Sequence, residues 1–590
     1  MKFSESPLLS RLVPPRRGRV LLLMLMGCFV ALLARAFYLQ TMRNDFLQQK
    51  GESRYSRVLE LSATRGRILD RQGDVLAVST PVKSVWAIPE DARLAPAGLR
   101  RLASILGTSA RELTRILASD KDFVYLQRQV PPDVAARVEA LRLPGIHQSR
   151  EFRRYYPSGE VMAQLLGFTG VEDGGQEGIE LAFDAQLAGK PGSRRVIKDR
   201  RGNIVEDVES IRSPREGRDI VLALDAKIQY MAYAAIRQAV EEHRAAAAGA
   251  VVLDAKTGEI LAMANLPTYN PNNRGRLSGA QLRNRAVTDT FEPGSTLKPF
   301  TIALALDQER VRFDTPIDTR PGRLTIGNAT ISDSHPNGVL TVAQVIQKSS
   351  NVGAARIALG AQPEDMWGMF ARLGFGEPLK LGFPGEAGGR LRPWQHWRPI
   401  EQATMAYGHG ISVSLIQLAR GYLAFARDGE ILPLSLTRLD APPPGGVQVF
   451  SVRTAREVRT MLEMAAGPEG TAPKARVPGY RVAGKTGTAH KLAGGRYAER
   501  YVASFVGFAP VSDPRLVVAV MIDEPTVGGY YGGQIAAPVF SRVMGGALRA
   551  LGVRPDAPEQ AVHEAPGGQS APPAAGPAAI RISYPQRGLR

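Results

Sequence analysis

The chain has 590 residues, of which 44% are hydrophobic and 22% are charged. This length exceeds what one ordinary hydrophobic core requires, so two or three folded domains are expected. The formal net charge of +19 comes from basic residues spread along the chain without a dense block, which argues against nucleic-acid binding. A cationic surface that faces an anionic envelope or membrane explains the charge instead.

The N-terminal segment predicts a single membrane span. Residues 1–19 contain one lysine and four arginines, and residues 20–39 form an apolar stretch long enough to cross a bilayer. Positive charge before the span predicts that residues 1–19 stay inside the cell and the rest lies outside. The small-x-small pattern at residues 34–36 leaves a cleaved signal peptide as an alternative. Cys28 is the only cysteine, so no disulfide framework is available.

Residues 40–218 are predicted to form an α+β pedestal domain. Residues 40–60 resemble a polar helical stalk, and residues 64–79 alternate apolar positions around a turn, which predicts a β-hairpin. Helical periodicity occurs within residues 90–150, whereas residues 151–218 contain short strand-like pieces. No catalytic cluster stands out in this region.

Residues 219–552 are predicted to form a second, mixed α/β domain. Its start has the order strand, long amphipathic helix and two strands, and further strands are expected near its end, at 480–488, 503–510 and 515–523. Helices fill much of 296–425, so one sheet is expected to contain both ends of the domain. Residues 553–590 are rich in Pro, Ala and Gly and are predicted to be disordered.

Three short motifs follow one another in this second domain. They are Ser295-Thr296-Leu297-Lys298, Ser349-Ser350-Asn351 and Lys485-Thr486-Gly487-Thr488. Ser-x-x-Lys, Ser-x-Asn and Lys-Thr-Gly in this order are the signature of penicillin-binding proteins and class A β-lactamases. A second Lys-Thr-Gly, at residues 256–258, precedes the other motifs and has the sequence of a hairpin turn, so we exclude it from the site.

The first motif fits a serine nucleophile with a lysine base. If Ser295 begins a helix, Lys298 lies on the same face and reaches its hydroxyl. Apolar neighbours and a second ammonium are expected to lower the pKa of Lys298 until it can accept a proton. Ser349 can pass that proton on, and Lys485 supplies positive charge from a strand expected to end at this motif.

The remaining motif residues suit substrate binding. Asn351 can bind a substrate amide, Gly487 lets a substrate backbone lie against the strand, and Thr486 and Thr488 can hold a carboxylate. His409 is the one histidine that invites a Ser-His-Asp triad, but we interpret it as structural. Neither a His-Glu-x-x-His motif nor a cysteine cluster indicates a metal site.

These motifs, together with "RGRILDRQGDVLAVSTPVKSVWAIP" (65–89) and "YYPSGEVMAQLLGFTGVEDGGQEGIE" (155–180), make the chain resemble division-type class B penicillin-binding proteins. The resemblance implies that Ser295 attacks the D-Ala-D-Ala bond of a peptidoglycan stem peptide and passes the acyl group to an amine on a neighbouring stem. Lys298 would be the base, and Ser349 with Lys485 would relay protons. The oxyanion hole would use main-chain N–H groups of Ser295 and Thr488.

The resemblance also implies partners and a location. β-Lactams would acylate Ser295, no cofactor is expected, and a lipid-II glycosyltransferase and other division proteins would contact the chain in the inner membrane at the septum. Asn351 fits the division type. The alternatives are a β-lactam sensor, a β-lactam hydrolase, a D,D-carboxypeptidase and a catalytically silent scaffold. The single span with 19 residues inside argues against the sensor, the pedestal against the hydrolase and the carboxypeptidase, and the intact motifs against the scaffold.

Overall fold

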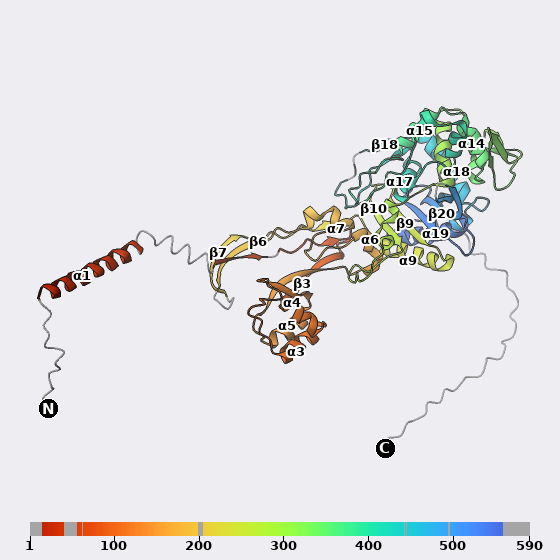
Figure 1. Ribbon diagram of the computed structural model, residues 1–590. Coiled ribbons are helices and arrows are strands. Elements are labelled where there is room, and N and C mark those ends of the chain that lie inside the picture. Colours follow the sequence, from red (N-terminus) through yellow and green to blue (C-terminus); the bar gives the residue numbers. More distant parts are fainter. Residues whose placement is uncertain are drawn as a thin grey trace, which may run out of the picture.

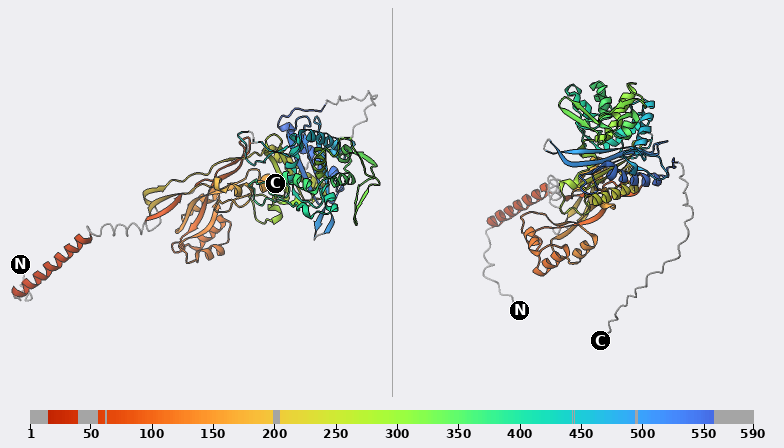
Figure 2. Two further views of the ribbon diagram at one scale, coloured as in Figure 1. Left: turned by 90° about the horizontal axis from the view of Figure 1, so that it is seen from above. Right: turned by 90° about the vertical axis from the view of Figure 1, so that its right-hand side faces the viewer.

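The computed structural model describes residues 15–39, 56–61, 63–198, 204–441, 443, 445–493 and 496–557. The first element is helix α1 (Pro15–Phe37), which is long and apolar enough to cross a membrane and has no buried residue. It stands at one end of an elongated molecule, with the largest domain at the other end (Figures 1 and 2). Residues 553–557 of the predicted disordered tail (553–590) are held against the C-terminal domain, since the Tyr480 hydroxyl donates to the Val553 main-chain oxygen at 2.6 Å and the Asp556 carboxylate accepts from the Arg481 N–H at 2.7 Å. Residues 558–590 lie outside the described residues.

The N-terminal domain contains two sheets. In the first, strands β4 (Val124–Val130), β3 (Val75–Ala87), β2 (Ile68–Leu69) and β8 (Ile220–Val221) are neighbours, and β5 (Ile146–Tyr155) also pairs with β3. Helices α3 (Pro96–Leu106), α4 (Ala110–Leu117) and α5 (Pro132–Ala140) share an apolar core with β3 and β4. The β2–β3 pair confirms the predicted hairpin, and the lobe formed by α3–α5 projects to one side (Figure 1).

The second sheet corrects the predicted stalk. Strand β1 (Ser56–Leu61) pairs antiparallel with β6 (Gly192–Lys198), which pairs with β7 (Ile204–Arg212). The helical interpretation is therefore wrong for residues 56–60, because pairing with a distant strand overrides the local polar pattern. Residues 40–55 lie outside the described part of the chain.

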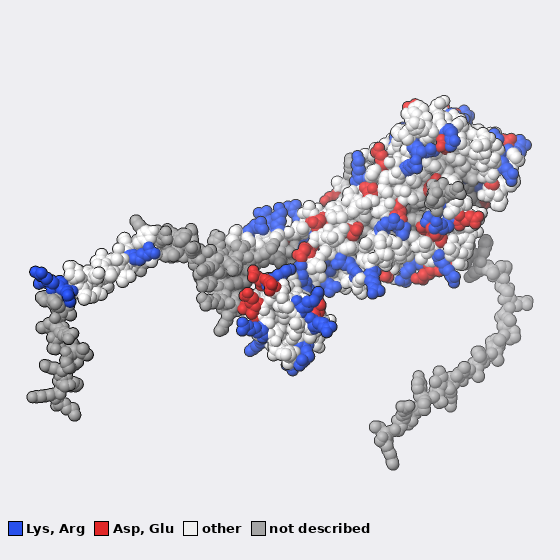
Figure 3. All heavy atoms as spheres, viewed as in Figure 1, with Lys and Arg blue, Asp and Glu red and all other residues white. Residues whose placement is uncertain are grey.

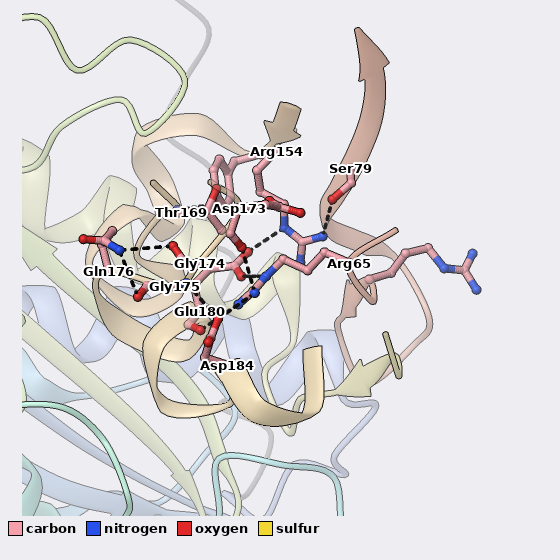
Figure 4. Close-up of polar contacts among 12 residues, drawn as sticks. Arg65, Ser79, Arg154, Thr169, Asp173, Gly174, Gly175, Gln176, Glu180 and Asp184 are labelled. Carbon is pink, nitrogen blue, oxygen red and sulfur yellow. Dashed lines mark hydrogen bonds and ion pairs between the residues drawn. The ribbon is translucent and has the colours of Figure 1, made fainter. Parts of the chain in front are cut away.

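A buried charge network holds this domain together (Figure 4). Glu180 is fully buried and accepts from Arg65 Nε at 2.6 Å and from Arg154 Nε at 2.7 Å. Arg65 also contacts Asp184 at 2.7 Å and the main-chain oxygen of Asp173 at 3.0 Å. Burial raises the pKa of the Asp173 carboxyl to about 6. Since a buried charge is costly without partners, these contacts stabilise the joint between the strands and the short helices that follow them.

The short helices of this joint connect β5 to the second sheet. They are η2 (Gly159–Met162), α6 (Ala163–Leu166), α7 (Gly178–Ala182) and α8 (Asp184–Leu187). The boundary between the two domains at 218/219 stays a prediction, because β8, just beyond it, still pairs with β2.

The C-terminal domain is built on a five-stranded antiparallel sheet in the order β10-β9-β21-β20-β19. Its strands are β9 (Ala247–Asp254), β10 (Ile260–Leu266), β19 (Ala483–Ala493), β20 (Arg496–Ala509) and β21 (Leu516–Asp523). Both ends of the domain thus contribute to one sheet, as the sequence predicts. Strand β19 begins and ends later than predicted, so its Lys-Thr-Gly motif lies in the first half of a long strand.

Helices cover both faces of this sheet. Alternate residues of β9 enter two different cores: Val251 belongs to the core that includes α12 and α17, and Val252 to the core that includes α9 and α19. Figure 1 shows α9 and α19 on one side and α14, α17 and α18 on the other. The bounds are α9 (Ala226–His243), α12 (Lys298–Asp307), α14 (Asn351–Leu359), α17 (Leu415–Ala426), α18 (Val452–Ala466) and α19 (Gly532–Ala550).

Shorter elements complete the domain. The helices are α10 (Gly279–Leu282), α11 (Arg285–Thr288), η3 (Gly294–Leu297), α13 (Val342–Gln347), α15 (Pro363–Arg372), η4 (Trp394–His396), α16 (Pro399–Met405) and η5 (Pro473–Ala475). The strands are β11 (Thr290–Phe291), β12 (Pro316–Asp318), β13 (Arg323–Ile326), β14 (Ala329–Ser332), β15 (Val339–Thr341), β16 (Val413–Ser414), β17 (Glu430–Ile431) and β18 (Val447–Gln448). Positive and negative side chains are interspersed on the viewed face (Figure 3).

Candidate active site

Ser295 lies in a tight turn at the start of a buried helix. Gly294 has a φ of +58°, and residues Gly294–Leu297 form the 3₁₀ helix η3, which leads directly into α12. Ser295 is therefore placed one turn before the α-helix, not at its first residue as predicted. Lys298 still lies beside it, because residues three apart share a face in both helix types. The Lys298 Nζ is 2.9 Å from the Ser295 Oγ.

Lys298 is fully buried and surrounded by oxygen atoms. Its Nζ lies 2.6 Å from the main-chain oxygen and 3.1 Å from the Oγ of Ser349, and 2.7 Å from the Oδ1 of Asn351. Burial and the nearby charge of Lys485 hold the pKa of Lys298 well below its ordinary value, although the Asp333 carboxylate acts in the opposite direction. This shift favours the neutral amine over the ammonium, and a neutral amine can accept the serine proton.

The Ser349–Asn351 motif joins α13 to α14. Ser349 has a φ of +61°, which turns the chain so that both its oxygens face Lys298, and the Ser350 side chain caps α14. The Asn351 amide is engaged at both ends, since its Oδ1 contacts Lys298 and its Nδ2 donates to the Ser332 main-chain oxygen at 3.0 Å. Its contacts thus differ from the substrate amide contact that we predicted.

Asp333 is a residue of the site that sequence reasoning missed. Its carboxylate accepts from the Ser350 Oγ at 2.6 Å and from the main-chain N–H groups of Asn351 and Val352 at 2.5 and 2.9 Å. It follows the β13–β14 hairpin and precedes Ser350 by 17 residues along the chain. A negative charge beside two N–H groups at the start of a helix is favourable. No local sequence pattern indicates this contact.

Lys485 brings a second ammonium to the same serine. It is fully buried on β19, and its Nζ lies 3.0 Å from the Ser349 Oγ and 3.2 Å from the Thr486 Oγ1. Burial lowers the pKa of Lys485 to about 7. Ser349 therefore connects two lysines that can each exist in neutral or charged form, and a proton can move along this path.

The other residues of the strand motif lie beside the nucleophile turn. A Cβ on Gly487 would lie 2.3 Å from the Ser504 Oγ and 2.8 Å from the Pro293 main-chain oxygen, so the nucleophile turn itself requires glycine here. The Thr488 Oγ1 accepts from the Gly532 N–H at 3.1 Å, whereas the Thr486 Oγ1 lies 3.0 Å from that of Thr471. The structure thus brings all three predicted motifs together.

The second Lys-Thr-Gly motif and His409, which we excluded from the catalytic group, do not join its hydrogen bonds. Residues 256–258 form the turn between β9 and β10, and Lys256 pairs with Asp513 at 2.7 Å instead of entering the site. His409 lies near the site, with its ring 5.1 Å from that of Tyr407, but burial lowers its pKa to about 4. Among the described residues, no cluster of three or more His, Cys, Asp or Glu side chains could hold a metal ion.

Comparisons with known proteins agree with this geometry. A model of the penicillin-binding protein transpeptidase domain matches residues 248–545, and one of the penicillin-binding protein dimerisation domain matches residues 60–222. The chain is 45% identical over 536 residues to "Probable peptidoglycan D,D-transpeptidase PenA" of Neisseria gonorrhoeae, covering 90% of this chain and 92% of the relative. It is 43% identical over 547 residues to "Peptidoglycan D,D-transpeptidase FtsI" of Escherichia coli, with the same coverage.

A solved structure gives the same result for the C-terminal domain. The transpeptidase domain of penicillin-binding protein 3 from Burkholderia pseudomallei is 53% identical and aligns with a TM-score of 0.53, covering 57% of this chain and 98% of that one. Fold and site therefore define a penicillin-binding transpeptidase domain preceded by a dimerisation domain. The chain belongs to the family of division-type class B penicillin-binding proteins.

Proposed function

We propose that the protein is a septal peptidoglycan D,D-transpeptidase that works through a serine acyl-enzyme. The Ser295 Oγ attacks the carbonyl of the D-Ala-D-Ala bond in a donor stem peptide, and the terminal D-alanine leaves with a proton. An amine of a neighbouring stem then attacks the ester, which forms the cross-link and frees the serine. The observation that carries the proposal is the fully buried Lys298 Nζ, 2.9 Å from the Ser295 Oγ.

Each motif residue has a part in this reaction. Neutral Lys298 accepts the Ser295 proton, and Ser349 passes it toward Lys485 and the leaving amine. Asn351 holds Lys298 in place through its Oδ1. The main-chain N–H groups of Ser295 and Thr488 stabilise the developing oxyanion.

Substrate binding completes the assignment. Thr486 and Thr488 bind the terminal carboxylate of the donor, whose backbone lies along β19, and Gly487 lets the nucleophile turn approach this strand. β-Lactams take the same place and acylate Ser295.

We further propose how the protein sits in the cell. Residues 1–19 lie in the cytoplasm, α1 crosses the inner membrane once, and the catalytic domain lies in the periplasm at the division septum. The apolar, unburied surface of α1 supports a membrane partner there, a lipid-II glycosyltransferase, with other division proteins around it.

The test is a reaction of the full chain in detergent with uncross-linked peptidoglycan, followed by mass spectrometry of the digested products. Wild type is expected to release D-alanine and form cross-linked dimers, and Ser295→Ala to do neither. Release of D-alanine without dimers would identify a D,D-carboxypeptidase. A folded wild-type protein that forms neither product would be a silent scaffold.

A further inference from the structure

A partly buried carboxylate lies immediately before the nucleophile turn. Glu292 follows β11 and precedes Ser295 by three residues. Its Oε1 accepts from the Gly410 N–H at 2.9 Å, and the Tyr497 hydroxyl lies 3.2 Å from Oε1 and 3.1 Å from Oε2. Tyr497 belongs to β20, so Glu292 connects the nucleophile segment with the hairpin whose other strand contains the Lys485 motif.

The loop that contacts Glu292 is fixed close to the catalytic residues. A Cβ on Gly408 would lie 2.3 Å from the Gly294 main-chain oxygen, so the two segments touch along their backbones. From this loop, the Tyr407 ring centre lies 5.9 Å from the Lys298 Nζ, and the His409 ring lies 5.9 Å from that of Tyr497. A row of rings thus leads from the catalytic lysine to Glu292 at the rim of the site.

The charge of Glu292 lacks a partner of opposite sign. Both of its hydrogen-bond donors are neutral groups, and no side chain that the structure describes forms an ion pair with it. Its position is partly buried, and burial raises its pKa. A carboxylate that is partly desolvated and not paired gains most from a cation supplied by a ligand.

The proposed reaction offers such a cation. Cross-linking requires a free amine on the stem peptide, and that amine is an ammonium ion until it attacks. Three residues separate Glu292 from Ser295 by at most about 11 Å of chain. An amine on the donor residue that precedes the acylated alanine, or on an acceptor stem that approaches the ester, can therefore lie within reach of the Glu292 carboxylate.

We propose that Glu292 is the residue of this protein that binds the ammonium group of a stem peptide and so selects amine-bearing stems. This inference rests on the proposed transpeptidase function and extends it to substrate selection. The Tyr497 hydroxyl and the Gly410 N–H hold the carboxylate at the rim, where the ammonium forms a charge-assisted hydrogen bond with it.

The test compares two thioester donors that end in D-alanine. One has lysine before the D-alanine, and the other has Nε-acetyl-lysine, which cannot form an ammonium. Glu292→Gln keeps the acceptor for the Gly410 N–H but removes the charge. Glu499→Gln is the matched control, because Glu499 is an exposed carboxylate on β20, the strand that contains Tyr497. Tyr497→Phe keeps the charge and removes only the hydroxyl.

The donor arm measures thiol release without an acceptor, and the acceptor arm measures the ratio of aminolysis to hydrolysis with a free-amine tripeptide and the acetylated donor. If Glu292 binds the donor amine, the preference for the lysine donor over the acetylated donor is about tenfold smaller in Glu292→Gln than in wild type. If Glu292 binds the acceptor amine, the ratio of aminolysis to hydrolysis is about tenfold smaller in this variant. Glu499→Gln keeps both values within twofold of wild type. The values of Tyr497→Phe lie between those of Glu292→Gln and Glu499→Gln.

Two results would overturn the inference. One is a Glu292→Gln protein that keeps both ratios within twofold of wild type. The other is an equal loss with both donors and with an amine-free fluorescent penicillin, which would make Glu292 only a clasp for the turn. Failure of the proposed function itself is distinct, because wild type would then either release no thiol or release thiol by hydrolysis alone, without any aminolysis product.

Discussion

The Lys298 Nζ lies 2.9 Å from the Ser295 Oγ, although the lysine side chain is completely buried. The short distance places the base beside the nucleophile, and burial lowers the pKa of the base. A buried ammonium is unfavourable, so the fold favours the neutral amine that the reaction needs.

Lys298→Arg should abolish acylation while keeping a long basic side chain. Arginine stays protonated and cannot accept the Ser295 proton, so the acylation rate is expected to fall by roughly 10²–10⁴-fold. Stopped-flow or gel measurement of fluorescent penicillin labelling gives this rate. A folded Lys298→Arg protein that labels within tenfold of wild type would exclude Lys298 as the base.

The buried lysines should make stability depend on pH. Burial lowers the pKa of Lys485 from its ordinary value of 10.5 to about 7. Between these values the unfolded chain binds more protons than the folded one, so the free energy of unfolding rises with pH from about 7 to about 10.5. The gain in unfolding free energy of Lys485→Met over wild type should therefore be larger at pH 7 than at pH 9. Thermal unfolding at the two pH values measures this difference. An equal difference at both pH values would contradict the assignment.

Asp333 should matter to acylation without touching the nucleophile. Asp333→Asn loses the charge that holds the Ser350 hydroxyl and two N–H groups, and it is expected to lower the acylation rate roughly tenfold by displacing Ser349 and Asn351. Asp318→Asn changes an exposed carboxylate that pairs with Arg320 and should leave the rate within twofold. Similar rates for the two variants would show that the Asp333 contacts do not position the motif.

Alanine variants of two glycines in one loop distinguish the effect of a steric clash from that of backbone strain. Gly408 and Gly410 have φ values of +87° and +81°, but a Cβ on Gly408 meets Gly294 at 2.3 Å, whereas one on Gly410 meets nothing closer than 3.9 Å. Alanine should strain both backbones alike. Gly408→Ala is expected to lower penicillin acylation at least tenfold more than Gly410→Ala. Equal losses would mean that the contact with the nucleophile turn is not needed.

The charge network of the N-terminal domain should be essential for stability. Glu180→Gln leaves Arg65 and Arg154 buried with a neutral partner, and such a change costs about 3–5 kcal/mol. Glu172 pairs with Arg128 but is exposed, so Glu172→Gln should cost about 1 kcal/mol or less. Chemical unfolding of both variants measures the difference. Equal costs would contradict the role of the buried network.

The sequence predicts the elements whose pattern is local. The hairpin of β2 and β3, the long helix α9 and the strands β9, β10 and β21 all follow from apolar periodicity and turn residues. The three motifs predict which side chains meet, because Ser-x-x-Lys places its members on one helical face wherever the turn begins.

Contacts between distant segments escape such reasoning. The strand β1 depends on β6, more than 130 residues away, and its own polar sequence suggests a helix. Asp333 reaches the site through the packing of the hairpin before it. Glu292 is next to the nucleophile in sequence, but its partners Gly410 and Tyr497 come from distant segments. Neither acidic residue has a spacing that marks it. The positive φ of Ser349 is likewise imposed by its neighbours and not by its residue type.

The most direct measurement is covalent labelling of the detergent-solubilised chain with a fluorescent penicillin, with the labelled peptide mapped by mass spectrometry. We expect a stable label on the peptide that contains Ser295 and none in Ser295→Ala. A well-folded wild-type protein without label, or a label on another residue, would contradict the assignment of Ser295 as the nucleophile.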